Sequence, residues 1–224
     1  MTLLPSALEV TEVDRQSARD YEHLRAPEVY AASFRLVEPY FLGRRTLDLG
    51  CGTGVYLKRL APGSVGIDYS VPNLRESQSI GLSVIRCDLN DRLPFANGSF
   101  EGVLISHTLE HVDAPIRLLR EAARVLMPGG VLAIALPFER SLVRLALRDD
   151  YFRGHPTHFY SFSVPCLDQL TSACGLRRIR IVLDPPLIRR LRIWPVLNFF
   201  QVLPFSIARW FCGNFWYLAR KAGT

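Results

Sequence analysis

The chain has 224 residues and a formal net charge of +6, with 49% hydrophobic and 21% charged residues. This composition excludes an intrinsically disordered chain and fits a single globular unit with a substantial buried core. Residues 1–16 carry three acids and lack a basic start followed by an apolar stretch, so no secretory signal is expected there.

Positive charge is concentrated in the last quarter of the chain. Nine basic residues follow Thr171, with Asp184 as the one acid: Arg177, Arg178, Arg180, Arg189, Arg190, Arg192, Arg209, Arg220 and Lys221. A basic C-terminal face of this kind suits a phosphate-bearing partner, either anionic lipid or nucleic acid. A solvated, arginine-rich surface explains the same pattern equally well.

The cysteines are odd in number and widely spaced, without a CxxC pair: Cys51, Cys87, Cys166, Cys174 and Cys212. Neither a disulfide framework nor a zinc site is therefore indicated, and a reducing, cytoplasmic location fits best. His155 and His158 lie close in sequence but have no clear third ligand nearby, so no metal site is predicted.

In chain order, the first predicted element is a helix over residues 26–42 with apolar groups at helical spacing. Short apolar runs then alternate with helical stretches. Strands are expected at residues 45–49, 65–68, 83–88, 102–106, 131–136, 176–183 and 214–219. Helices are expected at residues 55–60, 72–79, 114–126 and 164–175. Such alternation predicts an α/β fold with a mostly parallel sheet and helices on both faces.

Residues 184–213 form an unusual segment between the last two predicted strands. Within it, residues 193–208 carry no charge, but Pro195 and Pro204 interrupt them and the run is too short to cross a bilayer. Flanking arginines and aromatic residues are typical of a segment that lies on a membrane surface. A hydrophobic cap over a substrate pocket, or a dimer face, fits the segment equally well.

The chemistry-bearing pattern is a strand that ends in Asp48-Leu49-Gly50 and runs into Cys51-Gly52-Thr53-Gly54. Glycines let the backbone approach a ligand closely because they have no Cβ. Asp68 follows at the end of the next strand, where a carboxylate can accept hydrogen bonds from both ribose hydroxyls of an adenosine ligand. The three glycines have the spacing GxGxG, so the turn lacks the final glycine of the GxGxxG dinucleotide fingerprint. It also lacks the lysine of a phosphate-binding loop. Both differences favour recognition of adenosine over recognition of phosphate.

Five motifs in series resemble the class I S-adenosylmethionine (SAM)-dependent methyltransferases, in particular the small bacterial group similar to the ubiquinone and menaquinone methyltransferases. The motifs are LDLGCGTG, VGID, Cys87-Asp88-Leu89, LPFANGSFEGVLISHTLEHV and LLREAARVLMPGGVLAIALP. The resemblance runs from about Arg44 to Pro137 and implies a Rossmann-like, seven-stranded, mostly parallel sheet that binds SAM. One domain, 1–224, is expected, with a helical cap at 1–43, a core at 44–183 and 214–221, and an insertion at 184–213.

By this resemblance, the cofactor site is made of residues at the ends of four strands. Asp48 and the glycines would line the methionine part of SAM, Asp68 would bind the ribose, Asp88 would contact the adenine amino group, and Ser106 would border the transferred methyl. The full predicted set is Asp48, Gly50, Cys51, Gly52, Gly54, Asp68, Tyr69, Asp88, Leu89 and Ser106.

A methyl acceptor with a hydroxyl or amine needs a base, and histidine suits that role at neutral pH. His158 matches a recurring histidine of the family and is the first candidate, followed by His111 and His107. The alternative for each of the three histidines is a purely structural role, such as capping a helix or satisfying a buried carbonyl.

We therefore expect a cytoplasmic SAM-dependent methyltransferase, monomeric or homodimeric, whose acceptor is a small or lipid-like molecule. Membrane contact is expected through residues 184–213, and no RNA-binding signature is present. Two alternatives stay open: an RNA or protein methyltransferase that uses the basic face, and a SAM-binding scaffold without turnover.

Overall fold

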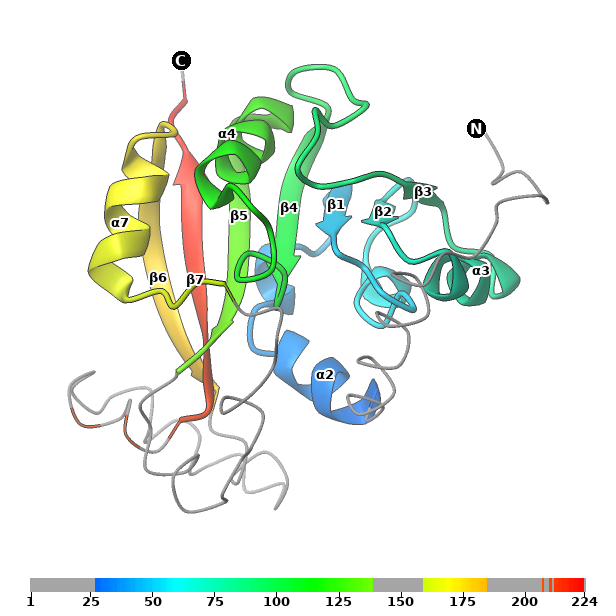
Figure 1. Ribbon diagram of the computed structural model, residues 1–224, viewed down its shortest axis with the longest axis horizontal. Helices are drawn as coiled ribbons and strands as arrows, with labels where there is room; N and C mark the ends of the chain where they lie inside the picture. Colours follow the sequence, from blue (N-terminus) through cyan, green and yellow to red (C-terminus); the bar gives the residue numbers. More distant parts are fainter. Residues whose placement is uncertain (1–26, 139–158, 185–206, 208–209, 211, 224) are drawn as a thin grey trace.

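A seven-stranded sheet in the order β3-β2-β1-β4-β5-β7-β6 forms the centre of the molecule (Figure 1). The structure is a computed structural model that describes residues 27–138, 159–184, 207, 210 and 212–223. β7 runs antiparallel to both of its neighbours, and the other pairs are parallel. The strands are β1 (Thr46–Leu49), β2 (Val65–Asp68), β3 (Val84–Arg86), β4 (Phe100–Ser106), β5 (Leu126–Pro137), β6 (Leu176–Asp184) and β7 (Asn214–Lys221). The predicted seven-stranded, mostly parallel sheet is thus confirmed.

Helices lie on both faces of this sheet and beside its ends. They are α2 (Pro27–Phe34), α3 (Val71–Ser79), α4 (Pro115–Val125) and α7 (Val164–Ser172), with short 3-10 turns at η1 (Glu38–Tyr40) and η2 (Leu57–Arg59). In Figure 1, α4 and α7 cover one face, while α2 lies near the lower ends of β4 and β5. The layered arrangement is the predicted Rossmann-like one.

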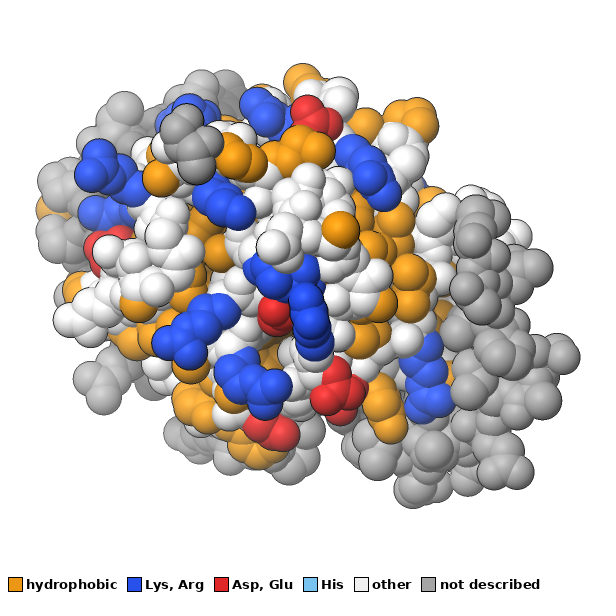
Figure 2. Space-filling view, turned by 90° about the horizontal axis from the view of Figure 1, so that it is seen from above, with side chains coloured by type: hydrophobic (Ala, Val, Ile, Leu, Met, Phe, Trp, Pro, Cys, Tyr) orange, Lys and Arg blue, Asp and Glu red, His pale blue; other side chains and the backbone are white. Residues whose placement is uncertain are grey.

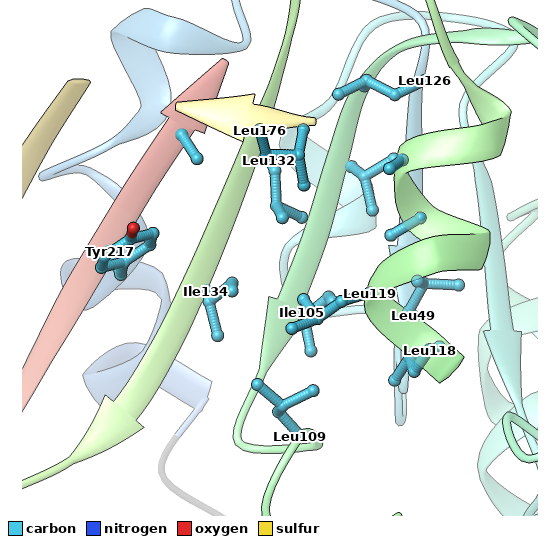
Figure 3. Packing of buried hydrophobic residues seen from close by; sticks show 14 of the residues in the cluster. Leu49, Ile105, Leu109, Leu118, Leu119, Leu126, Leu132, Ile134, Leu176 and Tyr217 are labelled. Carbon is cyan, nitrogen blue, oxygen red and sulfur yellow. The ribbon is translucent and has the colours of Figure 1, made fainter. Parts of the chain in front are cut away.

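The two faces of the sheet bury different hydrophobic clusters because side chains alternate along each strand. Leu49, Ile105 and Ile134 pack with α4 on one face, where Leu118 and Leu119 point toward the sheet (Figure 3). Leu104 and Trp216 belong to the other face, with aromatic residues from α2 and the segment after it. Asp48 pairs in register with Leu104, so its carboxylate lies on this second, aromatic face.

The predicted helix over residues 26–42 is wrong in its extent. α2 ends at Phe34, and the chain continues as turns and then as η1. Pro39 has no N–H to donate to the preceding turn, so an α-helix cannot continue unbroken through residue 42. The predicted helix at residues 55–60 is likewise reduced to the single turn of η2.

The start of β5 also differs from the prediction. The sequence predicts a helix that ends at residue 126 and a strand that begins at residue 131. Instead, the fully buried Leu126 pairs with Phe100, and the strand begins there. The register then shifts, because several exposed residues bulge between this pair and the next, Gly102 with Val131.

The described part of the basic C-terminal region lies away from the glycine turn. Arg177 pairs with Arg220 and Leu176 with Lys221 at the amino-terminal edge of the parallel strands. Figure 2, which views the molecule from the top of Figure 1, shows Lys and Arg side chains distributed among hydrophobic groups. Among the described residues, no helix is both long and apolar enough to cross a membrane.

Candidate functional site

The glycine turn after β1 is fixed to the end of β2 by backbone hydrogen bonds. The N–H groups of Gly50 and Cys51 both donate to the carbonyl oxygen of Ile67, at 2.8 and 2.9 Å. Gly52 donates its N–H to Oδ2 of Asp68 at 2.8 Å. The turn and the acid predicted to bind one ligand are therefore joined directly.

Gly50 is required at its position for two independent reasons. Its φ of +79° lies in the left-handed region, which costs other residues about 1–2 kcal/mol. A Cβ at this position would also collide with the side chain of Thr108, which follows β4. The absence of a side chain lets the turn pack against the loop after β4, so the ends of β1, β2 and β4 converge.

Asp48 is a buried carboxylate in the region where these strand ends converge. It is 1% exposed, and no described residue donates a hydrogen bond to either of its carboxylate oxygens. Burial, together with the charge of Asp68, raises its pKa from 3.8 to about 7. A buried carboxylate without a donor is costly, and a bound cation would relieve that cost.

Asp68 is also buried, at 6% exposure, but its carboxylate is well supplied with donors. Oδ2 accepts from Gly52 N–H, and Oδ1 accepts from Ser70 N–H at 2.9 Å. An ionised carboxylate has about four acceptor positions, so ribose hydroxyls can still bind. Asp68 thus organises the turn as well as facing the ligand region.

The predicted adenine-side residues follow β2 and β3. Tyr69 is 41% exposed, and the guanidinium of Arg86 lies 4.7 Å from its ring centroid. Asp88 is exposed and accepts a hydrogen bond from Asn90 N–H at 2.8 Å, while Leu89 is half-buried. These residues leave both an aromatic surface and a carboxylate accessible beside Asp68.

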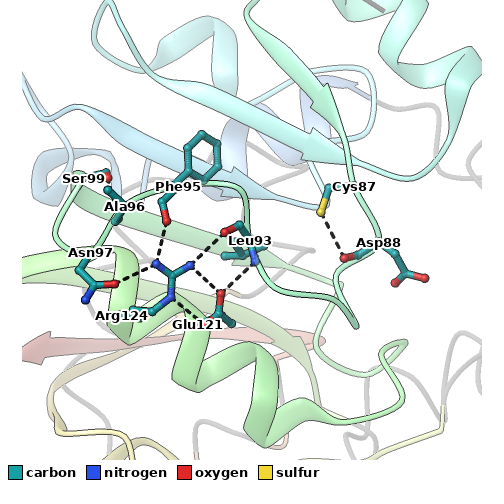
Figure 4. A network of polar contacts seen from close by, with 9 residues as sticks. All are labelled: Cys87, Asp88, Leu93, Phe95, Ala96, Asn97, Ser99, Glu121 and Arg124. Atoms are coloured by element: carbon teal, nitrogen blue, oxygen red, sulfur yellow. Dashed lines mark hydrogen bonds and ion pairs between the residues drawn. The ribbon is translucent and has the colours of Figure 1, made fainter. Parts of the chain in front are cut away.

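The loop between β3 and β4, which continues from Asp88, is held by a partly buried ion pair between Arg124 and Glu121 of α4. Arg124 of α4 donates to Oε2 of Glu121 at 2.7 Å and to the carbonyl oxygens of Phe95 and Leu93, at 2.7 and 3.0 Å (Figure 4). Glu121 in turn accepts from Leu93 N–H at 2.9 Å. Arg124 therefore anchors this part of the site to α4.

The loop after β4 brings the acceptor-side candidates to the same edge. Ser106 is buried and donates to the hydroxyl of Tyr56 at 3.2 Å. His107 and His111 both follow within this loop and are partly exposed. His158 lies outside the described residues, but its successor Phe159 donates its N–H to the carbonyl oxygen of Glu110 at 3.0 Å.

Sequence reasoning missed three residues of this site: Tyr30, Tyr56 and Glu110. The Tyr30 ring packs edge-on against Tyr56 and His107, with centroid distances of 6.4 and 6.2 Å. Glu110 is completely buried beneath the loop. The spacing His107-x-x-Glu110 is a signal that could have indicated Glu110, whereas nothing local indicates the tyrosines.

The comparisons with known proteins concern the same part of the chain. A family model described as a methyltransferase domain matches residues 47–134, which contain Asp48, the glycine turn and the loop after β4. The chain is 42% identical over 97 residues to a demethylmenaquinone methyltransferase of Corynebacterium urealyticum, covering 42% of this chain and 41% of that protein. It is 38% identical over 96 residues to the "Probable tRNA methyltransferase 9B" of Bos taurus, covering 41% of this chain and 21% of that protein.

The chain therefore spans less than half the length of these relatives. Among solved structures, a SAM-dependent methyltransferase from Archaeoglobus fulgidus matches with a TM-score of 0.69 at 21% identity. That match covers 92% of this chain and 99% of the other, and shows the same fold.

Proposed function

We propose that the chain is an enzyme that moves a methyl group from SAM to a small or lipid-like acceptor. In support, residues 47–134 match a methyltransferase-domain model, and the fold is that of a SAM-dependent methyltransferase. The observation that carries this proposal is the buried Asp48 carboxylate, which no described residue hydrogen-bonds, beside the glycine turn. SAM has a positively charged sulfonium and ammonium, and is thus a ligand that such an environment favours.

The residues present fit the cofactor. Asp48 and the glycines of the turn, which have no side chains to block a ligand, would line its methionine part, and Asp68 would bind its ribose hydroxyls. The exposed Asp88 would bind the adenine amino group, with Leu89 and Tyr69 against the ring. In support, all of these residues occupy the carboxyl ends of β1, β2 and β3, where open α/β sheets bind ligands.

SAM supplies an electrophilic methyl group. The protein's part is to align the acceptor, exclude water and receive the acceptor's proton. Ser106 and Tyr56 form a buried wall at the end of β4, and His107 and His111 follow directly. His158 stays a further candidate base, because Phe159 is tied to the same loop.

The acceptor is proposed to bind beside the two long connections at the carboxyl edge. Phe138 N–H donates to Gly213 O at 2.8 Å, and Asp184 pairs in register with Asn214. The segments 139–158 and 185–213 therefore both connect to the sheet beside the site. The apolar composition of residues 193–208 favours a lipid-like acceptor and contact with a membrane surface.

Methyl transfer tests this proposal directly. The protein is incubated with SAM that carries a radiolabelled methyl group, and with separate preparations of quinols, polar lipids and unmodified tRNA. We expect label in the organic-extractable product and its loss in Asp68→Ala, while the exposed-site control Asp91→Ala stays active. Absence of label from every small-molecule and lipid fraction would overturn the proposal.

Membrane contact needs its own experiment. Vesicles that contain anionic lipid should bind the wild-type chain, and the triple variant Trp194→Ser, Phe199→Ser, Phe200→Ser should bind them much less. Unchanged binding of the variant would refute a membrane role for this segment.

A second candidate is methylation of RNA, favoured by the likeness to a tRNA methyltransferase and by the cluster of Arg177, Arg178, Arg220 and Lys221. This cluster lies at the edge of the sheet opposite the glycine turn, so RNA would have to extend across the molecule to reach the site. Label appearing in tRNA alone would favour this candidate. Binding of SAM without transfer to any acceptor would instead support the scaffold alternative.

A further inference from the structure

The turn after β4 holds His107 in an unusual backbone conformation. Its φ is +49°, and no other non-glycine residue among those described has a positive φ. Its N–H donates to Ala135 O at 3.0 Å, and the next residue, Thr108, donates its hydroxyl to Ser106 O at 3.0 Å. The surrounding contacts therefore impose a conformation that costs about 1–2 kcal/mol for a residue with a Cβ, as is common where a side chain must be aimed.

Glu110 lies directly beside this histidine. Its Oε1 is 3.6 Å from Nδ1 of His107, and its side chain is only 1% exposed. No described residue hydrogen-bonds either carboxylate oxygen within 3.5 Å. Burial raises the pKa of Glu110, but the His107 imidazole and the charge of His111 outweigh burial and lower the pKa below its ordinary value.

The contact uses only one of the two ring nitrogens of His107. Nδ1 faces Glu110, whereas no described residue forms a hydrogen bond with Nε2. The rest of the ring packs edge-on against Tyr30 of α2, at a centroid distance of 6.2 Å. A carboxylate beside Nδ1 favours the tautomer with its proton on Nδ1, which leaves Nε2 as the basic atom.

We propose that Glu110 is a positioning residue that keeps a proton on Nδ1 of His107, so that Nε2 can receive the proton of the methyl acceptor. This inference rests on the proposed methyl transfer and selects His107 among the histidine candidates. As the bond from the acceptor oxygen or nitrogen to the methyl carbon forms and the carbon–sulfur bond breaks, the acceptor's proton moves to Nε2. The negative charge of the Glu110 carboxylate stabilises the resulting imidazolium, which later releases its proton to solvent.

The first test reads the tautomer of His107 without cofactor or acceptor. Nitrogen-15 NMR spectra of the full chain are recorded at about pH 9, where a histidine imidazole is neutral. The proton is expected on Nδ1 in the wild type and in Glu110→Gln, whose amide oxygen still accepts, and on Nε2 in Glu110→Ala. A wild-type proton on Nε2 would overturn the inference even if no variant folds, and so would an unchanged tautomer in Glu110→Ala.

The second test separates positioning from structural support. His107→Ala should lower kcat by roughly 100-fold or more, as for loss of a general base. Glu110→Gln should lower kcat by roughly 10-fold with an unchanged KM for SAM, because its neutral amide cannot stabilise the imidazolium. The exposed control Asp113→Asn should match the wild type, and full kcat in Glu110→Gln would refute the inference. The NMR result is independent of methyl transfer, so the two proposals can fail separately.

Discussion

Replacement of Asp48 by asparagine should stabilise the cofactor-free protein at about pH 8 while weakening cofactor binding. The Asp48 carboxyl group is buried, receives no hydrogen bond from a described residue, and interacts with Asp68, Cys51 and Tyr56, none of which is a cation. Its pKa of about 7 in the fold, against an ordinary value of 3.8, means that the folded state binds more protons than the unfolded state between these values. Stability therefore falls as the pH rises from about 4 to about 7.

The magnitude follows from the two pKa values. At about pH 8 the full difference applies, and the ionised carboxylate costs roughly 4 kcal/mol, whereas at about pH 5 the cost is roughly 2 kcal/mol. Asparagine removes this cost, but it buries an amide whose unmade hydrogen bonds cost about 1–3 kcal/mol at every pH. The benefit of Asp48→Asn should thus grow by roughly 2 kcal/mol between about pH 5 and about pH 8.

Urea denaturation of both proteins at these two pH values measures the effect, with the exposed Asp91→Asn as a control that should show no such change. The same variant should bind SAM more weakly, because the neutral amide cannot pair with its positive charge. A free-energy difference between Asp48→Asn and wild type that does not increase with pH would refute the reasoning.

Two further substitutions test the scaffold of the site, each against a matched control. Gly50→Ala should abolish SAM binding and cost more than about 2 kcal/mol of stability, because it adds a collision with Thr108 to the backbone strain. The control Gly43→Ala, with φ +68° and open space around it, should cost only the strain. Equal losses of stability in the two variants would contradict this account. Arg124→Ala should cost about 2–4 kcal/mol in urea denaturation by removing charged hydrogen bonds to the β3–β4 loop, whereas the exposed Arg120→Ala should stay within about 0.5 kcal/mol of wild type. Similar values for the two arginine variants would show that the loop is not anchored as described.

Local sequence patterns predicted those parts of the fold that local physics determines. The glycine turn and Asp68 were identifiable because only a few residue types tolerate the backbone approach and the ligand contact. The uncharged runs of β4 and β5 showed that both strands are buried. The early start of β5 at Leu126 was not predictable in the same way, because it depends on pairing with Phe100 across the sheet.

The electrostatic features of the site depend still more on contacts between distant residues. Nothing near Asp48 in sequence shows that its carboxylate receives no hydrogen bond from the described residues, since that follows from packing against the aromatic face. The basic C-terminal region likewise read as one face, but the pairing of β6 with β7 places Arg177 and Arg220 at the edge opposite the site. The number of cysteines and the overall composition carry no information about these long-range contacts.

Calorimetric titration with SAM and with S-adenosylhomocysteine tests the central claim most directly. The wild type should bind both compounds, and Asp68→Ala should weaken binding by at least tenfold, about 1.4 kcal/mol, because it removes both a ribose acceptor and the support of Gly52. Asp91→Ala should bind as the wild type does. If the wild type binds neither compound, the glycine turn has only a structural role and the methyltransferase account is contradicted.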